Sequence, residues 1–159
     1  MVVRRPFRRG SEELFVSPES QDVSTPAGTF ETPIEVRWGD MDALSHVNNT
    51  AYFRYFEEAR VRLLVELGLD GAHGRRSGVL AHAACDFLKP LLYPARVVVG
   101  MRLLRIGRTS LEMDAWIADA ADGTLHARGR NVLVCVGADG RPASWSESDR
   151  QVLARCFAA

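Results

Sequence analysis

Hydrophobic and polar residues alternate over residues 30–38 of this 159-residue chain. One set of positions is occupied by Phe30, Thr32, Ile34, Val36 and Trp38. Charged residues and one proline fill the positions between them. A period of two places successive side chains on opposite faces of a strand, so the pattern predicts a strand with one face buried. We expect Trp38 to share that apolar face.

The spacing of apolar residues then changes to three and four, which is typical of an amphipathic helix. The apolar positions are Tyr52, Tyr55, Phe56, Ala59, Leu63 and Leu67, and the opposite face carries Arg54, Glu57, Glu58, Arg60 and Arg62. The pattern predicts a helix of about five turns. Asn48 or Asn49 is placed to cap its start, and Gly68 is a stop signal.

Four later segments have patterns typical of strands. They span residues 79–87, 96–106, 110–117 and 126–136. Asp122-Gly123 is the strongest hairpin signal in the chain. Ser146, with Asp149 three residues later, predicts the capped start of a short helix that runs to about Phe157. We expect the strands to follow one another as hairpins, with the long helix covering one face of an antiparallel sheet in an α+β fold.

The composition limits the class of protein. The chain is 47% hydrophobic and is long enough for one domain with its own core. Twenty Lys and Arg balance twenty Asp and Glu, so a dedicated nucleic-acid-binding protein is disfavoured. No segment approaches the ~20 apolar residues of a membrane span. Three widely spaced cysteines without a CxxC pair indicate buried thiols in a reducing compartment, so we expect a cytoplasmic protein without a zinc site.

Residues 1–28 differ from the rest of the chain. Four arginines stand within the first nine residues, and Ser, Pro, Glu and Gly dominate after them. No apolar run of a secretory signal follows the arginines, and Glu12 and Glu13 come too early for a transit peptide. We interpret this segment as a loosely ordered arm, followed by a single domain over residues 29–159.

The apolar strand positions exceed what one helix can cover. Trp38 and the nearly continuous apolar run over residues 96–106 contribute most of this excess. Apolar faces of this size are rarely left in water, so we expect a second copy of the chain to cover them in a homodimer or homotetramer.

Residues 37–52 carry the candidate chemistry. Asp40 and Asp42 follow the first predicted strand, and a helix begins seven residues after Asp42. The first turn of a helix has unpaired backbone N–H groups and the positive end of its dipole. Those groups can stabilise an oxyanion, while a carboxylate nearby attacks a carbonyl or activates water. The segment therefore holds the minimum set of groups for acyl transfer without serine, cysteine or metal.

This segment resembles the hotdog-fold acyl-CoA thioesterases of the 4-hydroxybenzoyl-CoA thioesterase-like branch. The matching positions are Trp38, Asp40, Asp42, Asn49 and Tyr52, and the order of strand, helix and hairpins agrees over about residues 32–136. The resemblance implies a hotdog fold, in which an antiparallel sheet wraps around one long central helix. It also implies hydrolysis of an acyl-CoA to free acid and CoA, with no cofactor, in an oligomer whose active sites lie at subunit interfaces.

The resemblance implies a role for each matching residue. Asp42 would be the catalytic carboxylate, acting either on the thioester carbonyl or on water. Asn49 would supply the backbone N–H that polarises the carbonyl, and Arg108 would contact the nucleotide phosphates of CoA. His46 is left open between hydrogen bonding to the substrate and orienting the loop. Tyr52 is interpreted as a core residue that could also line an acyl pocket.

Other interpretations of the same residues stay open. Asp42 could simply cap a turn, in which case the chain would be a non-catalytic module that binds acyl-CoA. We interpret Asp40 as a carboxylate that holds the loop through backbone amides. A thioesterase acting on an acyl carrier protein would need a basic rim near Arg102, Arg105 and Arg108.

Overall fold

The computed structural model describes residues 28–71 and 76–158, so the predicted arm lies outside the described residues except for Gly28. The elements are β1 (Thr29–Glu35), the 3-10 helix η1 (Trp38–Asp40), α1 (Asn49–Glu66), β2 (Ser77–Phe87), β3 (Arg96–Ile106), β4 (Ser110–Asp119), β5 (Leu125–Val136) and α2 (Glu147–Cys156). Their order is the one that the sequence predicts, and Ser146 caps α2 as expected. No helix in the described part of the chain is long and apolar enough to cross a membrane.

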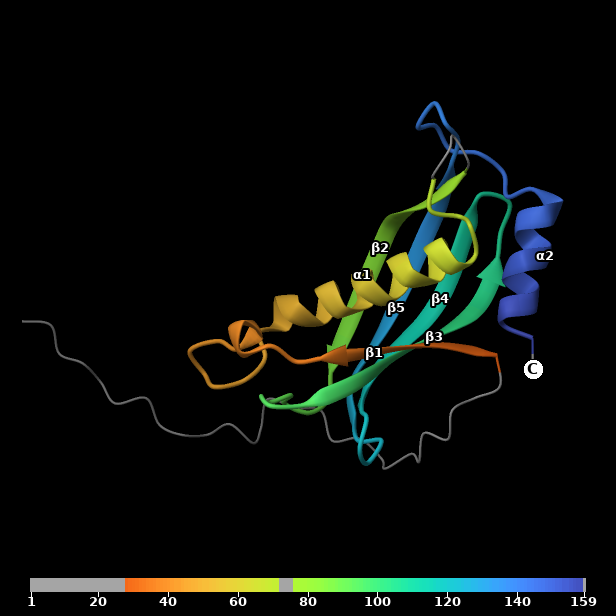
Figure 1. Cartoon of the computed structure of the whole chain (residues 1–159). Helices are drawn as coiled ribbons and strands as arrows, with labels where there is room; N and C mark the ends of the chain where they lie inside the picture. The colour runs from red at the N-terminus through yellow and green to blue at the C-terminus, as the bar shows by residue number, and fades with distance from the viewer. Residues whose placement is uncertain (1–27, 72–75, 159) are drawn as a thin grey trace, which may run out of the picture.

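The five strands form one antiparallel sheet in the order β1-β3-β4-β5-β2, and the sheet curves around α1 (Figure 1). The expected hotdog fold of the α+β class is therefore confirmed. The expected run of hairpins is wrong at one point, because β2 pairs with β5 instead of β3. The segment that follows β2 contains Pro90 and Pro94, which lack the N–H group that a hairpin ladder needs. Leu88 and Lys89 instead donate to the carbonyl of His126.

Helix α1 has the boundaries that its sequence signals predict. Asn48 is the N-cap, and its Oδ1 accepts hydrogen bonds from the N–H (2.9 Å) and the hydroxyl (2.7 Å) of Thr50. The chain leaves the helix at Gly68, whose φ of +66° lies in the left-handed region that glycine adopts without strain.

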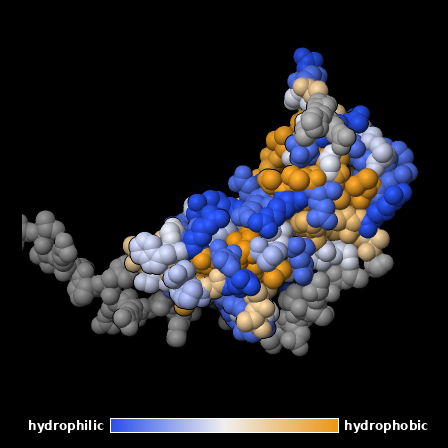
Figure 2. Space-filling model, in the orientation of Figure 1, coloured by the Kyte–Doolittle hydropathy of each residue, from blue (hydrophilic) through white to orange (hydrophobic). Residues whose placement is uncertain are grey.

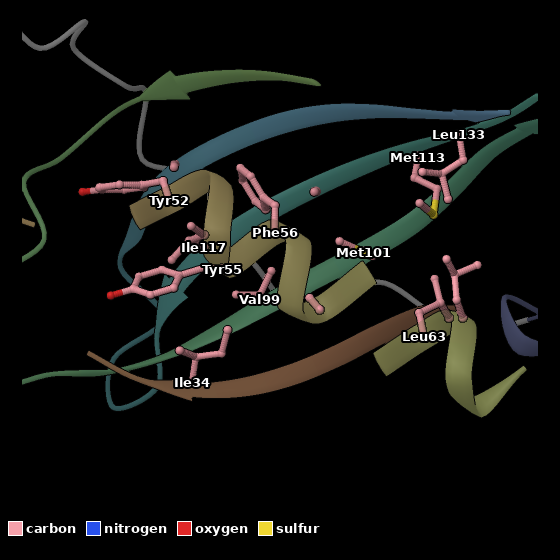
Figure 3. Packing of buried hydrophobic residues seen from close by; sticks show 14 of the residues in the cluster. Ile34, Tyr52, Tyr55, Phe56, Leu63, Val99, Met101, Met113, Ile117 and Leu133 are labelled. Atoms are coloured by element: carbon pink, nitrogen blue, oxygen red, sulfur yellow. The ribbon is translucent and has the colours of Figure 1, made fainter. Parts of the chain in front are cut away.

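The core lies between α1 and the concave face of the sheet (Figure 3). Its labelled members are Ile34, Tyr52, Tyr55, Phe56, Leu63, Val99, Met101, Met113, Ile117 and Leu133. Two sequence-based expectations are wrong here. Trp38 is 76% exposed, because β1 ends at Glu35 and the chain then turns into η1. Arg60, expected on the solvent face of α1, is only 8% exposed because α1 presents it to the sheet beside Asn131.

Candidate active site

Residues 40–48 form a narrow loop between η1 and α1. The backbone N–H of Asp42 donates to the carbonyl of His46 over 2.8 Å, and the N–H of Asn48 donates to the carbonyl of Asp40 over the same distance. These bonds turn the chain back on itself. The Asp42 carboxylate is therefore held in the same compact loop from which α1 starts.

Asp42 caps a turn within this loop. Its Oδ1 accepts a 2.8 Å hydrogen bond from the N–H of Leu44, and Ser45 has a φ of 63°, which is strained for a residue with a side chain. The side chain is half-buried. Its second oxygen, Oδ2, has no hydrogen-bond partner within residues 28–71 and 76–158. One oxygen of Asp42 thus orders the turn, while the other is available for chemistry.

Asp40 is buried, and its hydrogen bonds connect the loop to η1 and α1. Its carboxylate accepts hydrogen bonds from the N–H of Arg37 (3.0 Å), the guanidinium of Arg54 (3.0 Å) and the hydroxyl of Tyr55 (2.7 Å). The expected hydrogen bond from a backbone amide to Asp40 is present, and two side-chain donors add to it. The sequence analysis missed the two side-chain donors, because they lie 14 and 15 residues away and no local pattern connects them with Asp40.

The start of α1 offers a backbone donor. The N–H of Thr50 donates to Oδ1 of Asn48, whereas the N–H of Asn49 has no hydrogen-bond partner in the part of the chain that the structure describes. Asn49 is the first residue of an 18-residue helix, so this N–H lies at the positive end of the helix dipole. The arrangement suits a developing oxyanion.

Tyr52 connects the helix start to the segment between β2 and β3. Its ring is buried edge-on against Phe87, with 5.1 Å between ring centroids, and its hydroxyl accepts a 3.2 Å hydrogen bond from the N–H of Leu91. The Leu91 carbonyl in turn accepts from the N–H of Val47. Burial raises the pKa of the Tyr52 hydroxyl to about 12. These contacts give Tyr52 a structural role, and its contact with substrate stays a prediction.

His46 lies in the loop beside Asp42 but is not joined to it through its ring. The side chain is half-buried, and its imidazole has no hydrogen-bond or ion-pair partner among the described residues. Within the same residues, no group of three or more His, Cys, Asp or Glu is arranged to hold a metal ion. The role of His46 stays open between substrate contact and loop geometry.

Arg108 lies far from Asp42 within one chain. The register of β1 and β3 pairs Glu35 with Arg96, so the loop that carries Asp42 follows the end of the sheet where β3 begins. Arg108 is exposed in the turn after β3, an 11-residue strand that spans about 35 Å. A single protomer therefore does not bring the predicted phosphate contact and the predicted carboxylate together.

Comparisons with known proteins agree with this architecture. A family model described as the thioesterase-like superfamily matches residues 36–154. The PA2801 protein of Pseudomonas aeruginosa is 36% identical, with a TM-score of 0.72 over 78% of this chain and 97% of its own. A thioesterase from Thermus thermophilus, solved with coenzyme A and Zn, is 32% identical, with a TM-score of 0.71 over 80% of this chain and 93% of its own. The YsmA protein of Bacillus subtilis is 25% identical over 126 residues, which cover 79% of this chain and 85% of YsmA.

Proposed function

This chain belongs to the thioesterase-like superfamily, and on that basis we propose that it hydrolyses an acyl-CoA thioester to a free acid and CoA. One observation carries the proposal. A half-buried carboxylate with one unoccupied oxygen, Asp42, shares a compact loop with the unpaired N–H of Asn49 at a helix start. CoA as the thiol half of the substrate is supported by the Thermus relative, whose structure holds coenzyme A.

The reaction uses two groups of this chain. The N–H of Asn49 donates to the thioester oxygen and stabilises the negative charge that develops on it, and one such donor contributes about 3–4 kcal/mol to lowering the barrier. The carboxylate of Asp42 supplies the electron pair or accepts the proton that the attack requires. The carbon–sulfur bond breaks as the tetrahedral intermediate collapses, and the CoA sulfur leaves as a thiolate that takes up a proton.

Two routes are compatible with the position of Asp42. As a nucleophile, its oxygen bonds to the acyl carbon and forms a mixed anhydride, which water then hydrolyses. As a general base, it removes a proton from water, whose oxygen bonds to the acyl carbon directly. A single turnover in H₂¹⁸O tests the nucleophilic route. Label in Asp42 shows that an anhydride formed and that water attacked its Asp42 carbonyl, whereas the general-base route places label only in the product acid.

We propose that the active site is shared between two copies of the chain. Strand β2 is an edge of the sheet, and its Val79 and Leu80 are exposed apolar residues. Pairing β2 antiparallel with the same strand of a second copy covers these side chains and reverses the ends of the second sheet. Arg108 of the partner subunit then comes to the end of the assembly where Asp42 lies. A dimer would therefore bring Arg108 and Asp42 to one site, although they lie at opposite ends of the sheet in a single protomer.

A thiol-release assay on a panel of acyl-CoAs tests the proposal. The panel covers short, long and aromatic acyl groups, and it is run with the wild-type chain and with Asp42→Asn. We expect release of CoA by the wild type and its loss in the variant. Tight binding of an acyl-CoA without release by either chain would instead support the non-catalytic module.

An acyl carrier protein is the alternative donor, and it would need a basic rim on the protein. Arg102 forms an ion pair with Asp114 over 3.1 Å, and Arg105 forms one with Glu112 over 3.4 Å. Glu112 also forms an ion pair with Arg130, so two carboxylates face three arginines on this part of the sheet. Release of CoA from the acyl-CoA panel would favour CoA over a carrier protein. CoA is the donor that we propose.

A further inference from the structure

One flank of α1 faces the edge strand β2. At 100° per residue, Phe53, Glu57, Arg60 and Leu64 fall within a sector of about 60° on the helix. The ring of Phe53 lies 6.5 Å from that of Phe87 in β2, and Leu64 lies against Gly78 near the start of the same strand. This flank therefore points toward the side of the sheet where β2 has no neighbouring strand among the described residues.

Arg60 is a buried charge that makes no close ion pair with any described carboxylate. Its guanidinium makes a long hydrogen bond of 3.4 Å to Oδ1 of Asn131, and it forms no ion pair within residues 28–71 and 76–158. Burial lowers the pKa of Arg60, which reflects the cost of removing the cation from water, and the charge of Glu57 in the same chain offsets only part of this effect. Asn131 is also fully buried, and its Nδ2 has no hydrogen-bond partner in the described structure. Both side chains thus have hydrogen-bonding capacity that the protomer does not use.

Glu57 has the opposite charge and acts electrostatically on Arg60 of the same chain, without forming an ion pair with it. It lies three residues before Arg60 on the same flank of α1, is exposed, and makes no hydrogen bond or ion pair with any described residue. By contrast, the neighbouring Glu58 is paired with Arg62. The flank that faces β2 therefore carries an anion and a poorly solvated cation, a turn apart, that interact at longer range but form no close ion pair in the protomer.

A two-fold axis satisfies both charges at once. In an isologous contact, residue i of one copy meets residue j of the other, and j meets i. Two α1 helices that run antiparallel about a point between Glu57 and Arg60 bring each Glu57 to the Arg60 of the other copy. An axis at this point also lies level with the middle of β2, because Arg60 contacts Asn131, which pairs with Ala83.

The surface around this axis suits a second copy. Alanines occupy positions 81, 83 and 84 of β2, and Asp86 is its only Asp, Glu, Lys or Arg, so the strand has few of the charges that keep an exposed edge from pairing. Val79 and Leu80 are 52% and 39% exposed on the same strand. Figure 2 shows apolar surface on the β2 side of the hydrophilic band formed by α1. An apolar edge with a self-complementary charge pair favours a copy of this chain as the occupant.

We propose that Glu57 and Arg60 form two reciprocal ion pairs across a two-fold axis with Arg60 and Glu57 of a second copy, and that these pairs set the register of the β2–β2 contact. The inference rests on the dimer proposed above and assigns the residues that hold it. Neither Glu57 nor Arg60 is assigned a role in the hydrolysis.

The test compares Glu57→Arg with the matched variant Glu58→Arg in a dilution series followed by sedimentation velocity. Glu57→Arg places two like charges opposite each other, and we expect the dimer Kd to rise roughly 100-fold. Glu58→Arg makes the same change of charge on the solvent side of α1, and we expect a Kd close to that of the wild type. Circular dichroism checks that each chain folds, which we expect because both residues have access to solvent in the protomer.

The charge exchange Glu57→Arg with Arg60→Glu restores opposite charges across the axis, and we expect it to recover most of the lost affinity. A Glu57→Arg dimer as tight as the wild type overturns the inference, as does an exchange that leaves the dimer as weak as Glu57→Arg alone. A wild-type chain that is monomeric at micromolar concentration would overturn the proposed dimer itself. The two failures are therefore distinguishable.

Discussion

The hydroxyl of Tyr55 donates a 2.7 Å hydrogen bond to the carboxylate of Asp40, and this bond joins the inner face of α1 to the loop that precedes it. Both residues are buried, so water cannot replace the bond if it is lost. Figure 3 shows the hydroxyls of Tyr52 and Tyr55 at the same end of the core, next to the start of α1. Two tyrosine hydroxyls at this end of the core therefore form hydrogen bonds that hold the segments around the candidate active site.

Removing the hydroxyl of Tyr55 is expected to destabilise the fold. Tyr55→Phe leaves the buried carboxylate of Asp40 with two donors in place of three, which costs about 1–3 kcal/mol of unfolding free energy. Urea denaturation measures this loss. Tyr93→Phe is the control, because Tyr93 is exposed and its change should stay within about 0.5 kcal/mol. Equal stability of the two variants would show that Asp40 does not depend on Tyr55.

Asp42→Asn is expected to remove activity and to keep the fold. The amide oxygen still accepts the hydrogen bond from the N–H of Leu44, but the negative charge needed for attack or base catalysis is lost. We expect kcat to fall at least ~100-fold with a near-wild-type melting temperature. Asp139→Asn is the matched control, because Asp139 caps a similar turn through Arg141 at the other end of the same protomer. Retained turnover in Asp42→Asn would transfer the catalytic role to another group.

Arg108→Ala is expected to separate recognition of CoA from recognition of the acyl group. A phosphate contact remote from the thioester is made about equally in the ground and transition states, so its loss raises KM more than it lowers kcat. We expect a several-fold higher KM for acyl-CoA, a smaller effect at high salt, and unchanged hydrolysis of a truncated thioester that lacks the nucleotide. Equal losses on both substrates would mean that Arg108 supports the fold.

The buried hydroxyl of Tyr52 is expected to make stability fall in alkali. Burial raises its pKa from the ordinary 10.0 to about 12. Between these values the unfolded chain loses the phenol proton while the folded chain keeps it, so the unfolding free energy decreases as the pH rises. Tyr52→Phe should reduce that slope by up to one proton, or about 1.4 kcal/mol per pH unit. Urea unfolding from pH 8 to 11.5 measures the slope, and an identical slope in both chains would contradict the assignment.

The helix and its core were predictable because apolar periodicity reports which face is buried. Tyr52, Phe56 and Leu63 were identified in this way, and all three are buried. Arg60 was placed on the solvent face because it is charged, although its angle on the helix lies only about 40° from that of Phe56. The angle was the available signal, because a charged side chain can be buried where a polar group such as Asn131 accepts a hydrogen bond from it.

Strand existence was predictable, but strand order was not. The pairing of β2 with β5 depends on contacts between residues that are far apart in the sequence, such as Ala83 with Asn131, and no local pattern encodes it. The candidate site likewise has one part that the local sequence predicted and one part that it did not. The spacing from Asp42 to Asn49 identified the loop and helix start, whereas the donors to Asp40 required the folded helix.

The exposed Trp38 gives the protein an optical reporter. Trp38 begins η1, two residues before Asp40, and is open to solvent, whereas Trp116 and Trp145 are almost completely shielded. A collisional quencher such as acrylamide therefore reaches one emitter beside the loop and leaves the other two unquenched. A ligand seated against residues 40–48 would screen that emitter, so binding can be followed as protection from quenching in a variant that turns nothing over.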